Sequence, residues 1–351
     1  MKRCIYLKGT EPDLQFESEE HIFPAGIGGI QKLPEEYVSH NVNNGFSSIE
    51  LRFMRESLLS LPRQFHGPGK RGKLNPKWAT KSQICLMQDV KNPNVIELGF
   101  IVLGKPKALD QLKINTETNS VIFTTERTNK DDQKQFYDFQ QKLKGFNEHY
   151  ILHEDNRLKE EEFIIGYEGE KSRWHLAVKN TKIISNVFQI IQAFNNESTP
   201  KIIGSENVNR QVSVSQSLQI SENEYFRICA KIAFNYLAFT KGQEFVLQDN
   251  FDPIRNWIVN GGENQFAGFI KEPMIPELLK EHTIPDFAHT ILISRYENEI
   301  LAFINFYGDS FETMIKLSTN FKGEVPFLGY ICDWKNRREF NVYDLMQGKI
   351  D

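Results

Sequence analysis

The sequence has no long apolar run. No stretch approaches the ~20 consecutive apolar residues that a membrane-spanning helix requires. The N-terminus opens with Met-Lys-Arg and then turns polar, so it lacks the apolar core of a secretory signal peptide. We therefore expect a protein without a membrane partner.

Cysteine is also scarce. The chain has only four cysteines, and they lie far apart, at Cys4, Cys85, Cys229 and Cys332. This spacing excludes the dense cysteine framework of small disulfide-stabilised domains. A reduced, cytoplasmic protein is the simpler expectation.

The chain has no overall excess of positive charge, because its formal net charge is −4. This argues against a protein that coats nucleic acid, but an enzyme needs only a local basic patch. One patch without acidic residues contains Arg63, Lys70, Arg71, Lys73, Lys77 and Lys81. Its Gly and Pro residues predict an exposed loop, which could follow a phosphate backbone while Trp78 stacks on a base. A solvated connector between domains explains the patch equally well.

What the sequence does contain is ordinary globular material: 351 residues, 40% of them hydrophobic and 25% charged. Residues 1–24 predict two short extended pieces, and apolar periodicity predicts both helices and strands beyond them. The expected helices span 44–61, 131–147, 185–195, 221–241 and 252–259. The expected strands span 96–103, 120–125, 163–167, 176–178, 208–220, 290–294 and 300–306.

The helix over 221–241 has the clearest ends. Ser221 stands three residues before Glu224 in a capping-box arrangement, and Gly242 provides the stop. The elements together predict an α+β fold with a small N-terminal module at 1–62, a basic connector at 63–82 and a larger α+β domain at 83–351. That larger domain would select a target or regulate the module.

Three short motifs near the N-terminus carry chemistry. They are Glu20-His21-Ile22-Phe23-Pro24, then Gly28-Gly29, then Asn43-Asn44-Gly45 at the start of an amphipathic helix. Each alone is ordinary turn sequence or a chance pair, so the signal lies in their order. In that order they resemble the HNH, or ββα-metal, endonucleases over about residues 1–55. The resemblance implies an N-terminal ββα-metal module.

The chemistry of phosphodiester hydrolysis suits these residue types. The reaction needs an activated water and a cation to balance charge on the phosphate. Glu20 and Asn43 offer the oxygen ligands that Mg²⁺ or Mn²⁺ prefers. His21 is the natural general base, and on a strand it points away from Glu20, toward the water. The resemblance thus implies one catalytic cation held by Glu20 and Asn43.

The sequence departs from the family at its zinc site. The family often carries two Cys-x-x-Cys pairs, which would fall at residues 4, 7, 39 and 42, but this chain keeps only Cys4. A structural Zn²⁺ is therefore not expected. We expect Leu7 and Val42 to pack together in its place.

Two further groups of residues are weaker candidates. Glu50, seven residues beyond Asn43, is interpreted either as a group supporting the metal ligands or, more simply, as a solvated helix carboxylate. His40 is likewise either a supporting group or a solvated side chain. Arg227 and Lys231 lie four apart and could share an exposed basic helix face, although ordinary solvated residues are the simpler interpretation.

The sequence predicts a metal-dependent endonuclease, with DNA favoured over RNA as the substrate. A restriction or anti-phage defence effector would suit this architecture, and a protein partner or a homodimer is compatible with it. The alternative is a protein that keeps a worn HNH fold and binds nucleic acid or a small ligand without cutting.

Overall fold

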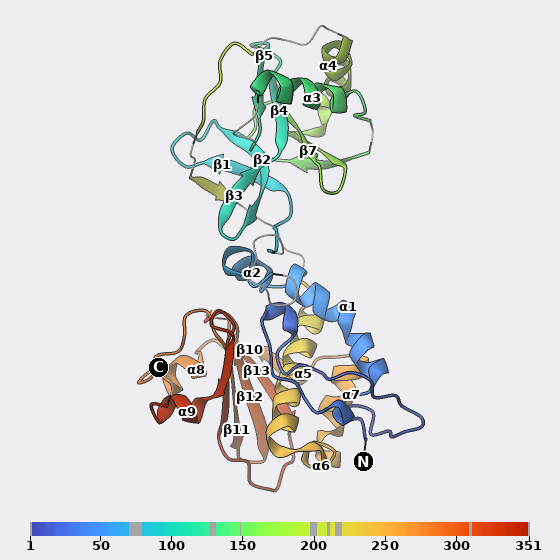
Figure 1. The fold of residues 1–351 in the computed structure, drawn as a ribbon, viewed down its shortest axis with the longest axis vertical. Coiled ribbons are helices and arrows are strands. Elements are labelled where there is room, and N and C mark those ends of the chain that lie inside the picture. The colour runs from blue at the N-terminus through green and yellow to red at the C-terminus, as the bar shows by residue number, and fades with distance from the viewer. Residues whose placement is uncertain are drawn as a thin grey trace. The chain divides into compact units, whose positions relative to one another are not determined.

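The computed structural model describes residues 2–69, 79–126, 131–147, 149–196, 202–208, 211–214, 220–308 and 311–349. It divides the chain into two compact units (Figure 1). Unit 1 combines Met1–Thr80 with Leu218–Asp351, and unit 2 is Lys81–Ser217. Both units contain helices and sheets, which confirms the α+β class. The predicted division at residues 62 and 82 differs from this, because 218–351 belongs with the N-terminal segment and unit 2 is an insertion.

The N-terminal segment of unit 1 is mostly irregular before its first long helix. It contains two short 3-10 helices, η1 (Ala25–Ile27) and η2 (Glu35–Tyr37), and then α1 (His40–Glu56) and α2 (Ser60–His66). Between residues 2 and 69 the extended pieces pair only as isolated bridges, Arg3 with Thr10 and His21 with Lys32. The predicted ββα order is therefore present only as bridged extended pieces followed by a helix.

The C-terminal part of unit 1 provides a six-stranded antiparallel sheet in the order β10-β13-β12-β11-β14-β15. The strands are β10 (Ala267–Phe269), β11 (His289–Tyr296), β12 (Glu299–Asn305), β13 (Thr313–Ser318), β14 (Leu328–Asp333) and β15 (Arg338–Asn341). Their side chains alternate between two cores, as strand geometry requires. Ile291 and Ile293 join the main core, whereas Leu292 joins a smaller one with α8 (Met274–Leu278) and the start of α9 (Val342–Met346).

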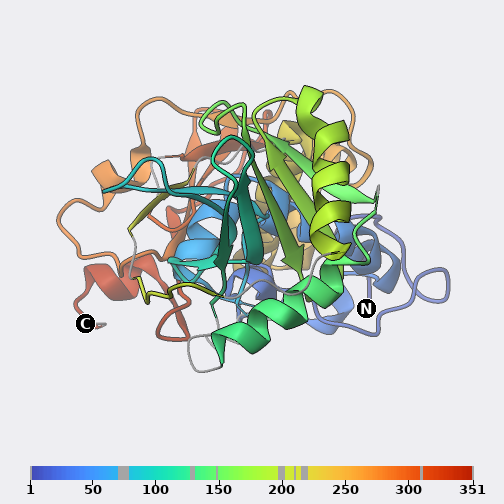
Figure 2. The same ribbon diagram turned by 90° about the horizontal axis from the view of Figure 1, so that it is seen from above.

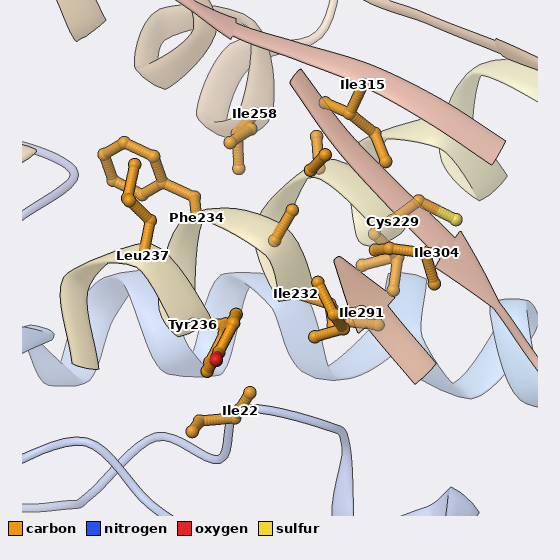
Figure 3. Close-up of a cluster of buried hydrophobic side chains, with 14 of the residues drawn as sticks. Ile22, Cys229, Ile232, Phe234, Tyr236, Leu237, Ile258, Ile291, Ile304 and Ile315 are labelled. Atoms are coloured by element: carbon orange, nitrogen blue, oxygen red, sulfur yellow. The ribbon is translucent and has the colours of Figure 1, made fainter. Parts of the chain in front are cut away.

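Helix α5 (Glu222–Lys241) forms the centre of unit 1. Every residue from Ile228 to Ala238 is buried, which is typical of a helix enclosed by other elements. Ser221 caps its N-terminus and Gly242 its C-terminus, as the sequence predicts. Figure 3 shows α5 between strands of the sheet and the N-terminal segment, with Ile22 facing Tyr236. Nearby lie α6 (Gln243–Val246), η6 (Asp249–Phe251) and α7 (Asp252–Asn260).

Unit 2 contains two sheets and two longer helices. The four-stranded sheet has the order β3-β2-β1-β9 and the five-stranded sheet the order β5-β4-β7-β8-β6. Their strands are β1 (Cys85–Asp89), β2 (Ile96–Val102), β3 (Lys105–Ala108), β4 (Asp110–Asn115), β5 (Ser120–Thr124), β6 (Tyr150–Glu154), β7 (Glu162–Glu168), β8 (Arg173–Val178) and β9 (Val212–Val214). Helices α3 (Asp132–Leu143) and α4 (Ile184–Asn196), the latter preceded by η5 (Thr181–Ile183), share a core with the five-stranded sheet (Figure 2).

Two predicted boundaries need correction. The helix expected over 44–61 is two helices, and Pro62 does not end it. Pro62 lies in the first turn of α2, where a helix needs no amide hydrogen from it. The strand expected over 208–220 is confirmed at β9, and residues 209–210 and 215–219 of that range lie outside the described residues. Among the described residues, no helix combines the length and apolar character that crossing a bilayer demands.

Candidate functional site

The segment that carries Glu20 and His21 is held as a narrow hairpin. Leu33 N donates to Glu20 O at 2.7 Å, and Ile22 N donates to Gln31 O at 3.0 Å. The predicted Gly-Gly loop closes this hairpin, and both glycines are required there. Gly28 has a φ of +103°, and a Cβ at Gly29 would collide with the carbonyl oxygen of Phe23. The Glu20-His21 pair and the Gly28-Gly29 pair therefore lie on the same tightly closed hairpin.

The carboxylate of Glu20 faces a lysine from the far end of the sequence. Lys231 Nζ on α5 lies 2.6 Å from Glu20 Oε1 and 2.6 Å from Glu50 Oε1 on α1. The side chains of Lys231, Glu20 and Glu50 are 1%, 5% and 20% exposed, so the cluster opens to solvent only near Glu50. We call these three residues the charge cluster. Lys231 is therefore neither an ordinary solvated residue nor part of an exposed basic face, which were the two interpretations from the sequence.

Burial and charge act in opposite directions within the charge cluster. Burial lowers the pKa of Lys231, but the carboxylates of Glu20 and Glu50 outweigh burial and raise the pKa above its usual value. Burial raises the pKa of Glu20, and the Lys231 ammonium opposes that rise. Lys231 therefore stays charged at neutral pH, with its ammonium also 5.2 Å from the ring centroid of Phe46.

A second contact ties the hairpin to α5 one turn later. Asn235 Nδ2 donates to His21 O at 2.9 Å, and Tyr6 Oη donates to Asn235 Oδ1 at 2.6 Å. Asn235 follows Lys231 by four residues, so both face the hairpin from one side of the helix. The backbone at Glu20-His21 is therefore held by main-chain bonds within the hairpin and by Asn235 on α5.

The imidazole of His21 is half-buried and close to positive charge. Burial, and then the neighbouring Lys32, lower the pKa of His21 below its usual value of 6.5. The ring is therefore neutral at pH 7 and able to accept a proton. A neutral imidazole is the protonation state that a general base needs.

Asn43 lies on α1 and contacts the segment that precedes Glu20. Its Nδ2 donates to Ser18 Oγ at 2.9 Å, and the side chain that converges with Glu20 is Glu50 instead. His40 lies nearby on α1, where its Nε2 is 2.7 Å from Asn44 Nδ2. Glu50, interpreted from the sequence mainly as a solvated carboxylate, instead shares the Lys231 ammonium with Glu20.

The described residues do not fit a divalent cation while Lys231 occupies this place. The ammonium lies within hydrogen-bond distance of the same Glu20 and Glu50 oxygens that would have to coordinate the metal, and two cations repel there. Within the ranges that the structure describes, no group of three or more His, Cys, Asp or Glu side chains is arranged to hold a metal ion.

The turn at Cys4, where the resemblance would place a zinc site, has its own arrangement. Leu7 is 44% exposed and lies outside the core that contains Val42, so the expected packing of Leu7 on Val42 is not part of that core. Main-chain bonds close the turn instead: Cys4 N donates to Gly9 O and Lys8 N to Cys4 O, both at 2.8 Å. Backbone hydrogen bonding thus shapes this corner.

The start of the basic connector is not the exposed loop that the sequence predicts. Arg63 is a buried residue of α2, and its guanidinium donates to the carbonyl oxygens of Gly26 at 3.2 Å and Met54 at 3.5 Å. It therefore serves the fold and is poorly placed to bind phosphate. The other predicted contacts lie outside the described residues; they are Lys70, Arg71, Lys73, Lys77 and Trp78.

Unit 1 also contains a cavity away from the charge cluster. It has a volume of about 610 Å³ and is lined partly by His282, Asp286, Lys335 and Arg338. None of the charge cluster lines it, and it contains no arrangement that matches the predicted chemistry.

Sequence reasoning missed Asn235, and it placed Lys231 on a solvated helix face although this residue is buried. The available signal was two polar side chains, four residues apart, within an otherwise apolar helix. Comparison with protein-family models, curated proteins and solved structures gave no match. The assignment of function therefore depends on the residues themselves.

Proposed function

We propose that the chain hydrolyses phosphodiester bonds in nucleic acid, with DNA as the favoured substrate and His21 as the general base. One observation carries the proposal: the half-buried His21 follows Glu20 on a hairpin whose backbone is fixed by main-chain bonds and by Asn235, and burial lowers the pKa of its imidazole. The motif order and this local geometry support it together.

In this proposal His21 accepts a proton from the attacking water. Lowering the pKa of His21 keeps its ring unprotonated, and its carbonyl bond to Asn235 restricts how the segment can move. The resemblance implies a requirement for Mg²⁺ or Mn²⁺, so the reaction is assayed with each. Unit 2 would select the target or control cleavage, as suits a restriction or defence effector.

Nicking of supercoiled plasmid DNA tests the proposal. We expect cleavage that depends on a divalent cation, and a loss of about 10²–10⁴-fold in rate for His21→Ala. His149→Ala, which removes an exposed histidine in unit 2, is the matched control and should cut like the wild type. Equal rates for the wild type and His21→Ala would reject His21 as the base.

A second function is favoured by the state of Glu20. Because Glu20 is already paired with Lys231, the chain could bind nucleic acid without cutting it. This alternative predicts binding that weakens steeply with salt and no nicking with either cation. Fluorescence anisotropy with labelled DNA at several salt concentrations, alongside the nicking assay, separates the two functions.

A further inference from the structure

Lys32 lies directly across the hairpin from His21. The two residues form an antiparallel bridge pair, and the main-chain bonds of the hairpin lie on either side of the pair and not within it. Opposed residues in such a non-hydrogen-bonded pair have Cα atoms about 4.5 Å apart, and their side chains come close together. The Lys32 side chain therefore leaves the hairpin on the same face as the His21 imidazole.

Lys32 carries its charge at the surface, unlike the other lysine that contacts this hairpin. The Lys231 side chain is 1% exposed and is shared between Glu20 and Glu50, so its ammonium is closed off from a ligand in solvent. The Lys32 side chain is 42% exposed, and its Nζ pairs with Oε2 of the similarly exposed Glu19 at 3.0 Å. An ion pair between two exposed side chains contributes little to stability. Another anion can therefore take the place of Glu19.

The ammonium of Lys32 is close enough to His21 to act on its ring. After burial, Lys32 has the largest effect in lowering the pKa of His21; Lys231 adds to it, and Glu50 and Glu19 oppose it. A base and an exposed cation side by side suit a phosphodiester, because the attacking water needs the base and the charged phosphate oxygens need the cation.

We propose that Lys32 binds the nonbridging oxygens of the phosphate that is cleaved, while His21 takes the proton of the attacking water. The inference rests on the proposed function and adds the residue that contacts the substrate phosphate. The water oxygen bonds to phosphorus, its proton passes to His21, and the bond to the leaving ester oxygen breaks. That oxygen takes a proton from solvent. Lys32 stays an ammonium throughout and stabilises the negative charge that builds on the phosphate.

Nicking of supercoiled plasmid by the full-length protein tests the charge of Lys32. Lys32→Gln removes the charge and should slow nicking by on the order of tenfold or more. Lys32→Arg keeps the charge and should recover most of the rate. Glu19→Gln breaks the same ion pair but keeps the cation, so it should cut at least as fast as the wild type. Lys280→Gln removes a lysine that pairs with Glu277 at 2.7 Å on the surface, and should change nothing.

Two further measurements do not depend on cleavage. Fluorescence anisotropy with labelled DNA should show that Lys32→Gln lowers the slope of log affinity against log salt by about 1, the loss of one phosphate contact. Histidine NMR titration should show a higher pKa for His21 in Lys32→Gln than in the wild type, because a neighbouring positive charge is removed. Lys280→Gln should leave both values unchanged.

The outcomes separate this inference from the proposed function. If no protein nicks DNA but Lys32→Gln lowers the salt slope, the phosphate contact holds and the proposed hydrolysis fails. If Lys32→Gln binds and nicks like the wild type, the contact is overturned while His21 can still be the base. Equal losses in Lys32→Gln and Glu19→Gln would mean that the ion pair only supports the hairpin, which also overturns the contact. A wild type that neither binds nor nicks DNA rejects both.

Discussion

At the scale of single residues, two glycines show how differently the same residue type can be constrained. Gly29 lies in the hairpin, where a Cβ would collide with the Phe23 carbonyl oxygen. Gly45 lies on α1 close to Asn43, and a Cβ there would meet nothing within 4 Å. The first glycine is required by geometry and the second is not.

Alanine at these two positions should have opposite effects. Gly29→Ala should lower the free energy of unfolding by more than ~3 kcal/mol, because backbone must move to admit the Cβ. Gly45→Ala should raise it by about 0.5–1 kcal/mol, because alanine favours the helix. Urea unfolding of each full-length variant measures both. A tolerated Gly29→Ala would mean that the hairpin is less tightly closed than described.

The histidines of unit 2 matter at the scale of the sheet. His153 Nε2 on β6 lies 2.9 Å from His175 Nδ1 on β8, and His175 Nε2 lies 3.4 Å from Glu168 Oε2 on β7. Burial, and then His175, lower the pKa of His153 to about 4. The two imidazole rings and the Glu168 carboxylate thus link the neighbouring strands β6, β8 and β7.

Acid should weaken unit 2 through this link. The pKa of His153 is lower in the folded chain than its usual 6.5, so between about pH 6.5 and 4 the unfolded chain binds more protons. The stabilisation is complete above pH 6.5 and is lost as pH falls toward 4. We expect a loss of the order of 1 kcal/mol, discounted because His153 is partly exposed.

His153→Gln tests this, since glutamine can still donate to His175 but does not titrate in this range. Its unfolding free energy, measured in urea at pH 7 and pH 5, should vary less with pH than that of the wild type. His149→Gln is the control and should keep the full dependence. The same dependence in all three proteins would show that His153 is not the titrating group.

The elements themselves were largely predictable, while the site was only partly so. Ser221 and Gly242 mark the ends of α5 in the sequence, and alternating apolar residues mark β11 and β12. These are local signals. The pairing of Lys231 with Glu20 joins residues 211 positions apart, and periodicity contains no information about such a contact. Asn43 was predicted as a ligand from the motif resemblance, which does not reveal that Glu50 shares Lys231 with Glu20.

The whole molecule depends on the return of the chain to unit 1. The main core contains Ile22, Phe46 and Phe53 from the N-terminal segment together with residues of α5 and β11. A fragment of residues 1–66 would expose those side chains and is too short to form an adequate core alone. Unit 2 has its own cores.

Fragments should reveal this difference. We expect residues 81–217 to fold alone and residues 1–66 to remain unfolded, as judged by the dispersion of amide signals in NMR spectra. Adding residues 220–351 as a separate chain should restore structure to the fragment 1–66. A folded 1–66 would instead support the independent N-terminal module that the sequence predicts.

The discontinuity of unit 1 also bears on how the protein is made. Glu20, His21 and Glu50 leave the ribosome early, but about 185 residues separate Glu50 from Asn235, and their synthesis takes roughly 10–40 s at ~5–20 residues per second. During that interval the hairpin has neither its lysine nor its asparagine. A nascent or prematurely terminated chain therefore carries every residue of the sequence motif without the contacts from Lys231 and Asn235 that hold the hairpin.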